Sequence, residues 1–169
     1  MMPLPIHLIN WIETHRHHLR PPVCNKVIWE DEQLFVMVVG SPNKRKDFHV
    51  NGDSEFFYQL EGQLLLHTLI EGRRQIITVN AGEIYLLPAN VPHCPVRPAG
   101  GVGMVIEHQR KPGQKDGFQW YCEQCNHLLY EEWLVVSDIE AQLSALMERF
   151  LASEVHRTCV QCGSVLSVK

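Results

Sequence analysis

The sequence has no apolar run of the roughly eighteen residues that a transmembrane helix needs, which argues against a membrane-spanning protein. Its N-terminal segment also lacks the basic start and the apolar stretch of a secretory signal. We therefore expect a cytoplasmic protein with no membrane partner. Basic residues form no stripe, and 15 Lys and Arg stand against 19 Asp and Glu. The net charge of -4 argues against nucleic acid as a partner.

Enough apolar content is present for one core, since 45% of the 169 residues are hydrophobic. Helical spacing of apolar residues predicts an N-terminal helix over residues 5–18. Short β-prone runs separated by turns then predict a mainly β sandwich or barrel. We expect strands at 34–39, 56–60, 64–70, 75–79, 84–87 and 103–108, with Glu71-Gly72 as a tight connection.

Two short motifs in this strand-rich part carry metal-binding side chains. His49, Glu55 and His93 offer two imidazoles and one carboxylate, a set that binds Fe(II) and leaves positions open for a substrate. The motifs run from Gly40 through His49-Val50-Asn51 and Glu55 to Gly62, and from Gly82 through Pro92-His93 to Arg97. They resemble the two cupin motifs, which implies a small antiparallel β-barrel or jelly roll. Asn51 departs from that pattern, because most cupins have a second histidine ligand there.

Four of the six cysteines form two CxxC pairs, Cys122 with Cys125 and Cys159 with Cys162. In a chain without signs of export, such pairs predict one tetrahedral metal site that four thiolates close, and therefore a structural one. Redox disulfides or unpaired thiols are the alternative. Cys94 should point away from the face of His93 as a small buried residue.

We predict a division into a cupin barrel with the catalytic iron over residues 1–112 and a four-cysteine appendage over residues 113–169. The boundary falls in the stretch from Lys111 to Gly117, where turn-forming residues gather. Helical periodicity returns only in the second part, where an apolar stripe predicts one helix with Leu143, Leu146, Met147 and Phe150 on one face. This helix lies between the two CxxC pairs, so the appendage should depend on its ion to fold.

Two arginines and a glutamate complete the candidate site. Arg45 and Arg97 each lie four residues from a histidine ligand, and strand alternation places each arginine on the face of that ligand. Buried guanidinium groups need an anion because arginine does not lose its proton, and a ligand carboxylate would satisfy them. Arg45 reads equally well as part of a solvated charged turn. Glu107 is either an inward carboxylate that can accept a proton or an exposed strand residue.

Taken together, these motifs and the cysteine tail resemble the bacterial 3-hydroxyanthranilate 3,4-dioxygenase family over nearly the whole chain. The resemblance implies cleavage of 3-hydroxyanthranilate by O2 to 2-amino-3-carboxymuconate semialdehyde, on the route to quinolinate and NAD. It implies catalytic Fe(II) on His49, Glu55 and His93. The family's substrate-binding residues fall on Asn25, Arg45, Arg97 and Glu107, and for Asn25 the resemblance is the only support.

The same resemblance implies a homodimer and a rubredoxin-like iron on the four cysteines, although zinc would satisfy the same thiolates. As a hypothesis, Arg97 anchors the substrate carboxylate, Arg45 stabilises charge that develops on reduced oxygen, and Glu107 handles a proton. These roles could be permuted.

Three other functions stay open on the sequence. A cupin isomerase or epimerase uses similar ligands but usually retains the histidine that Asn51 replaces. A thiol dioxygenase favours three histidines and lacks the carboxylate. A non-enzymatic cupin that senses a small carboxylic acid could bind a macromolecule with its cysteine knuckles. Metal retention separates these classes, because a sensor can work without iron and a dioxygenase cannot.

Overall fold

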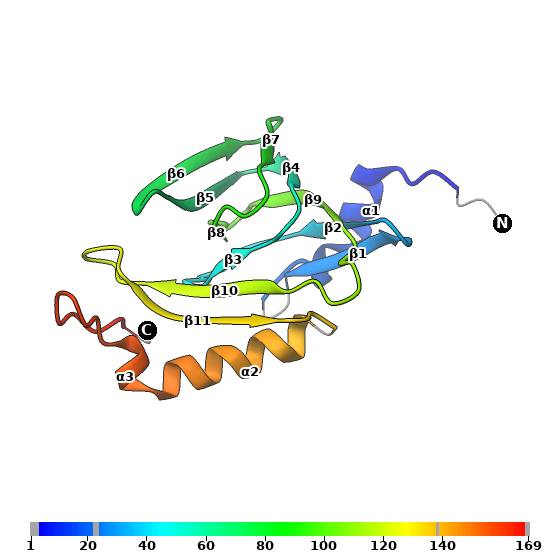
Figure 1. Cartoon of the computed structure of the whole chain (residues 1–169). Helices are drawn as coiled ribbons and strands as arrows, with labels where there is room; N and C mark the ends of the chain where they lie inside the picture. The colour runs from blue at the N-terminus through cyan, green and yellow to red at the C-terminus, as the bar shows by residue number, and fades with distance from the viewer. Residues whose placement is uncertain (1–3, 22–23, 138, 168–169) are drawn as a thin grey trace.

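Two antiparallel sheets form the centre of the molecule in the computed structural model, which describes residues 4–21, 24–137 and 139–167 (Figure 1). In spatial order, the five-stranded sheet contains β1 (Asn25–Glu30), β2 (Leu34–Val39), β9 (Val102–His108), β4 (Glu55–Glu61) and β7 (Ile84–Leu87). The six-stranded sheet contains β11 (Leu128–Leu134), β10 (Asp116–Tyr121), β3 (Phe48–Val50), β8 (His93–Val96), β5 (Gln63–Ile70) and β6 (Arg73–Asn80). The predicted mainly β fold class is confirmed.

The barrel core lies between the two sheets and follows from period-two alternation along the strands. In β4 and β5 every second side chain is buried, while most of the intervening ones are half-buried. The inner residues form one apolar cluster of Phe57, Leu64, Leu66, Val79, Leu87 and Val105. Burial of each such side chain contributes roughly 1.5–3 kcal/mol. The predicted turn at Glu71-Gly72 joins β5 to β6, with φ of 51° and 74°.

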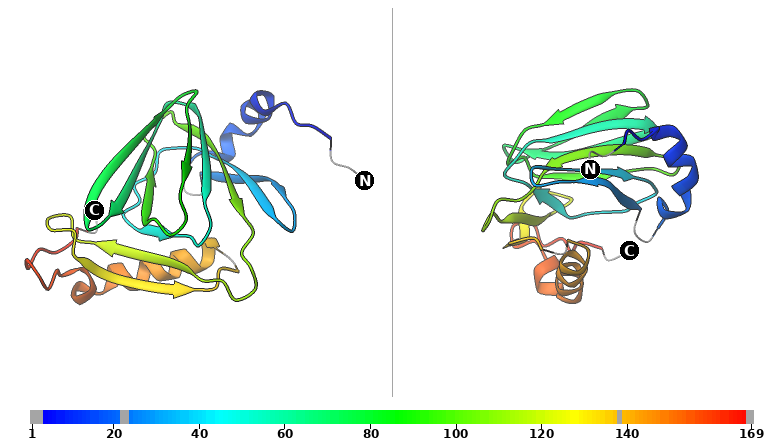
Figure 2. Two further views of the ribbon diagram at one scale, coloured as in Figure 1. Left: turned by 45° about the horizontal axis from the view of Figure 1, so that its top comes forward. Right: turned by 90° about the vertical axis from the view of Figure 1, so that its right-hand side faces the viewer.

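The N-terminal helix is shorter than predicted. α1 spans Leu8–His15, and the chain then tightens into a 3₁₀ turn, Arg16–His18, before it reaches β1. Ile12 and Leu19 pack against Val38 of β2 and Val102 of β9. The helix therefore lies on the side of the five-stranded sheet that faces away from the barrel core (Figure 2).

The C-terminal part consists of the β10–β11 hairpin with α2 (Ile139–Ala152) along it and the short α3 (Glu154–Arg157) (Figures 1 and 2). The predicted apolar stripe is confirmed, because Leu146 and Phe150 of α2 are buried against Phe118 and Trp120 of β10. The Trp120 and Phe150 rings stack with their centroids 4.5 Å apart.

Strand β10 lies beyond the predicted boundary at residue 112, yet it pairs with β3 of the barrel sheet. Gly117 is opposite Val50, and Phe118 is opposite His49. The barrel and the C-terminal part thus share one continuous sheet. Their division into two domains stays a prediction.

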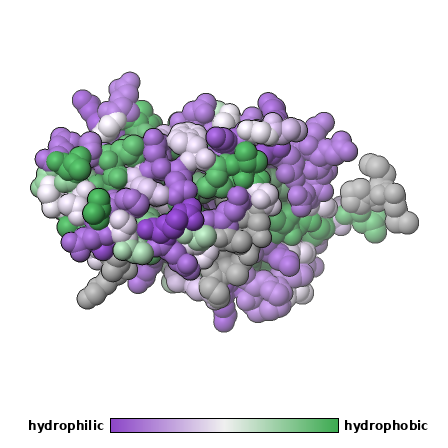
Figure 3. Space-filling model, turned by 60° about the horizontal axis from the view of Figure 1, so that its bottom comes forward, coloured by the Kyte–Doolittle hydropathy of each residue, from purple (hydrophilic) through white to green (hydrophobic). Residues whose placement is uncertain are grey.

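No helix in the described ranges is both long and apolar enough to cross a bilayer. On the face around α2, hydrophilic and hydrophobic residues are interspersed (Figure 3).

Candidate metal centre and substrate site

The three predicted metal ligands come together inside the barrel. His49 of β3 lies directly opposite His93 of β8, and Glu55 is the first residue of β4. One ligand atom from each residue lies within 4.8 Å of the others. Oε1 of Glu55 is 3.3 Å from Nε2 of His93 and 3.6 Å from Nδ1 of His49. The two motifs, far apart in the sequence, therefore form one candidate ion site.

Hydrogen bonds fix which nitrogen of each histidine faces the site. Nδ1 of His93 lies 2.9 Å from the carbonyl oxygen of Val91, so it carries a proton there and leaves Nε2 toward Glu55. Nε2 of His49 lies 2.7 Å from Oδ2 of Asp116, which leaves Nδ1 toward Glu55. Phe118 stacks on the His49 ring at a centroid distance of 5.2 Å. Metal-binding histidines are typically held by such second hydrogen bonds.

The electrostatics favour a cation between these groups. Burial acts to raise the pKa of Glu55, but the neighbouring His93 and His49 outweigh it and lower that pKa to about 2. Burial acts to lower the pKa of His93, but the charge of Glu55 raises it. Burial lowers the pKa of His49, so a neutral imidazole beside the Glu55 carboxylate is available to bind a divalent ion.

Asn51, which stands where most cupins have a histidine, is buried and turns its amide donor toward two carboxylates. Its Nδ2 lies 3.4 Å from Oε1 of Glu55 and 3.5 Å from Oε2 of Glu107. Its Oδ1 accepts a hydrogen bond from the backbone N–H of Asp53 at 3.0 Å, which fixes the amide orientation. Asn51 therefore turns its donor toward the two carboxylates, while its Oδ1 points to the backbone of Asp53.

Arg97 follows β8 directly and is only 2% exposed. Its Nε finds no hydrogen-bond partner among the described residues. Burial, together with the nearby positive charge of Arg45, lowers the pKa of Arg97 to about 10. A buried guanidinium without an anion is unfavourable, so this position is prepared for a negatively charged ligand.

Arg45 precedes β3, which begins at Phe48. The expected strand alternation therefore does not determine which way its side chain points. Its guanidinium donates two hydrogen bonds to Asp47, one of them from Nε at 3.2 Å. Asp47 is fully buried, and its charge, which outweighs the effect of burial, raises the pKa of Arg45. Arg45 is thus held in place by a buried carboxylate. Asp47 was not predicted from the sequence, although its position two residues before His49 was a usable signal.

Glu107 faces the barrel interior. It lies two residues after the core residue Val105, on the same face of β9. It is opposite Phe35 of β2 and is 7% exposed. Burial and the nearby charge of Glu55 raise the pKa of Glu107 to about 7. Of the two orientations left open by the sequence, the structure has the inward one, and the proton-accepting role stays a prediction.

Arg110 and Asp116 also belong to this network and were not predicted. Nη1 of Arg110 lies 2.7 Å from Oε2 of Glu107, and Nη2 lies 2.7 Å from Oδ2 of Asp116. Arg110 directly precedes the stretch 111–117 that the sequence indicates as the boundary, and Asp116 lies within it. Asn25, by contrast, is half-buried at the start of β1 opposite Val39. In the described parts of the chain, its side chain has no hydrogen bond to the other candidate residues.

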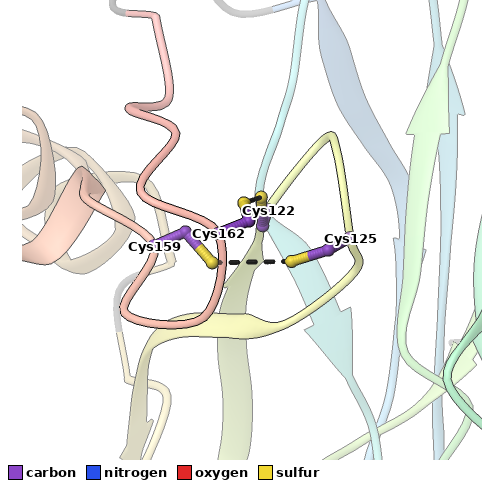
Figure 4. Close-up of side chains that lie close together, drawn as sticks. All are labelled: Cys122, Cys125, Cys159 and Cys162. Carbon is purple, nitrogen blue, oxygen red and sulfur yellow. Dashed lines mark hydrogen bonds between the residues drawn. The ribbon is translucent and has the colours of Figure 1, made fainter.

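The four cysteines of the tail also come together, two from the β10–β11 turn and two from the loop after α3 (Figure 4). All four sulfurs lie within 4.8 Å of one another, with 3.6 Å between Cys122 and Cys162 and 3.5 Å between Cys125 and Cys159. Burial acts to raise the pKa of Cys122, but hydrogen bonds from Ser164 and backbone N–H groups lower it to about 6. This geometry fits one tetrahedral metal ion. Cys94 is buried and donates to the carbonyl of Arg45, as a small core residue.

Comparison with known proteins gives a consistent picture. A family model described as 3-hydroxyanthranilic acid dioxygenase matches residues 1–151. The 3-hydroxyanthranilate 3,4-dioxygenase of Xanthomonas euvesicatoria is 50% identical over 94% of this chain and 90% of its own length. The enzyme of that name from Bacillus thuringiensis is 41% identical over 94% of this chain and 89% of its own. A cupin-2 domain protein from Shewanella frigidimarina superposes with a TM-score of 0.44 at 28% identity, over 50% of this chain and 79% of its own.

Proposed function

Because the chain belongs to the 3-hydroxyanthranilic acid dioxygenase family, we propose that the residues around His49, Glu55 and His93 are its active site. The enzyme opens the ring of 3-hydroxyanthranilate with O2 and forms 2-amino-3-carboxymuconate semialdehyde. The bond between ring atoms C3 and C4 breaks, and both oxygen atoms enter the product, so no other oxidant or reductant is consumed. The product cyclises to quinolinate, which leads to NAD.

His49, Glu55 and His93 would hold Fe(II). Two imidazoles and one carboxylate are the donor set of non-haem Fe(II) oxygenases, and the inward ring nitrogens and Oε1 fit such an ion. When bound, Fe(II) supplies a centre at which O2 and the ring oxygen of the substrate meet. Asn51 adds no ligand, which supports an ion with open positions.

The observation that carries the proposal is the buried guanidinium of Arg97, whose Nε has no partner among the described residues. The carboxylate of 3-hydroxyanthranilate is the anion that this group lacks. A two-pronged hydrogen bond between arginine and carboxylate fixes both position and orientation. Arg97 would therefore anchor the substrate with its ring over the metal ligands.

Glu107 and Arg45 would act on protons and charge. The hydrogen bonds that Glu107 accepts from Arg110 and Asn51 both end on Oε2, which leaves Oε1 to take the phenolic proton of the substrate. A pKa of about 7 suits that transfer near neutral pH. Arg45, held by Asp47, would stabilise negative charge that develops on oxygen. Asn25 as a substrate contact is supported by the family resemblance.

The charge count of the site supports a monoanionic substrate. When all groups are ionised, three arginines and four carboxylates leave one negative charge. A divalent ion changes this to one positive charge, and one substrate carboxylate then neutralises the site. The groups counted are Arg45, Arg97, Arg110, Asp47, Glu55, Glu107 and Asp116.

The four cysteines of the tail would hold a second, structural ion, iron or zinc. None of the six cysteines, all of which lie in the described ranges, forms a disulfide, which supports a reducing, cytoplasmic location. A homodimer is supported by apolar side chains left exposed on the edge strands β6 and β7: Ile76, Ile84 and Leu86.

The test is anaerobic loading with Fe(II), followed by mixing with 3-hydroxyanthranilate and O2 while the absorbance of the conjugated semialdehyde is followed. We expect the product with the native chain, and none with His49→Ala, which should also lose iron. His67→Ala is the matched control, because His67 lies on the outer face of β5 opposite Cys94 and should retain iron and activity. An iron-loaded native protein that leaves the substrate unchanged would overturn the proposal.

A further inference from the structure

We propose that Arg110 is a positioning residue that holds Glu107 directly and, through Asp116, a metal-ligating histidine. This inference rests on the function proposed above. It gives a functional role to a residue that is not among the predicted substrate-binding residues. It makes one side chain responsible for both the proton-handling group and the metal centre.

The geometry is a fork with three short links. One arm of the guanidinium reaches Glu107, with 2.7 Å between Nη1 and Oε2. The other arm reaches Asp116, with 2.7 Å from Nη2 and 3.1 Å from Nε to Oδ2. Oδ2 of Asp116 also lies 2.7 Å from Nε2 of His49. Charge-assisted hydrogen bonds of this length are among the strong ones.

Burial increases the contribution of these ion pairs to the stability of the site. The Asp116 side chain is fully buried, and those of Glu107 and Arg110 are 9% and 13% exposed. Exposed ion pairs contribute little to stability, whereas removal of one partner from a buried set leaves an uncompensated charge. Arg110 is further fixed by the ring of Phe35, with 5.5 Å from its guanidinium carbon to the ring centroid.

The chemistry requires arginine at this position. A planar guanidinium presents donors in two fixed directions at once, while a lysine ammonium is a compact point charge without this fork geometry. Without the fork, Asp116 would be free to turn away from His49, and Glu107 would lose its orientation. Loss of such a supporting contact typically lowers metal affinity about 10- to 100-fold.

The first readout is the affinity of the metal-free barrel site for Mn(II), measured by the electron paramagnetic resonance signal of the free ion. Mn(II) suits carboxylate ligands, whereas thiolates select softer metals, so the tail should not interfere. We expect Arg110→Met and Asp116→Asn each to weaken Mn(II) binding about tenfold or more. The double variant should be no weaker than Asp116→Asn alone, because Arg110 acts through Asp116.

The second readout is steady-state turnover of the iron-loaded enzyme. Arg110→Met should lower kcat strongly and change KM less than about threefold, since Arg97 still anchors the substrate. Arg110→Lys should recover part of the kcat because it keeps one link. The control is Arg149→Met, which removes a surface arginine bonded to Glu132 at 2.9 Å and should leave both readouts unchanged.

Native Mn(II) affinity in Arg110→Met, or additive losses in the double variant, would overturn the proposal. If Arg110→Met does not fold, Arg110→Lys decides the question, because it keeps the charge and loses the fork. A native enzyme that binds Mn(II) with this coupling but does not cleave 3-hydroxyanthranilate would refute the proposed function and leave the positioning role standing.

Discussion

Arg97→Met should make the protein more stable and a much poorer binder of its substrate. Burial lowers the pKa of Arg97 from 12.5 to about 10. A pKa shift of this size means that the charged form of Arg97 destabilises the folded state by about 3 kcal/mol at neutral pH. Met fills a similar space without that charge. For a chain of this length, the gain would raise Tm by up to about 10 °C.

The loss in substrate binding is expected to be of similar size. Truncation of one partner of a buried, hydrogen-bonded charge pair costs about 2–5 kcal/mol, which corresponds to roughly thirtyfold to several thousandfold in Kd. Scanning calorimetry of the metal-free protein gives Tm, and anaerobic titration of the Fe(II) protein with 3-hydroxyanthranilate gives Kd.

Arg16→Met is the control for this experiment, because Arg16 pairs with Glu13 and Glu61 at the surface and should change both quantities little. A lower Tm together with an unchanged Kd would refute the reasoning. Arg97 would then be a structural residue whose charge is compensated within the fold.

Three other outcomes are expected. Arg45→Met should lower the free energy of unfolding by about 3 kcal/mol in urea titrations, because it leaves Asp47 buried without its partner; recovery in Arg45→Met with Asp47→Asn would identify the cause, and unchanged stability would contradict it. The raised pKa of Glu107 means that the folded, metal-free protein holds this proton to higher pH than the unfolded chain does. Its free energy of unfolding should therefore fall as pH rises from about 4.5 to about 7, and Glu107→Gln should remove that slope; an identical slope in both proteins would exclude Glu107 as its source. Cys159→Ser should release the tail ion and reduce the helical circular dichroism signal of α2, and elemental analysis that shows an unchanged metal content would count against the four-cysteine site.

Several strands could be predicted from the sequence because runs of β-prone residues lie between clear turn signals. The predicted strands at 34–39 and 84–87 coincide with β2 and β7. The strands β3 and β8 could not be predicted in this way, because each contains a histidine and Pro95 interrupts β8. β10 was missed because all six of its residues are buried, so that no alternation of apolar and polar residues appears in it.

In the site, the residue types of the three predicted ligands were sufficient to predict that they meet. The motif spacing and the chemistry of iron made His49, Glu55 and His93 stand out, and the fold brings them together. The supporting residues Arg110 and Asp116 were not predictable in this way. Each is a common charged residue near a turn, and its role exists only through partners that the fold brings close.

The strand β10 sets a limit on modular engineering of this protein. It carries Asp116 at one end, next to the candidate iron ligand His49, and Cys122 follows its other end. Phe118, in its middle, stacks on His49 and also belongs to the core under α2. A shortened catalyst that ends at residue 112 would lack this strand and leave β3 as an open sheet edge prone to aggregation. Transplantation of the barrel alone into another scaffold should therefore fail unless the hairpin travels with it.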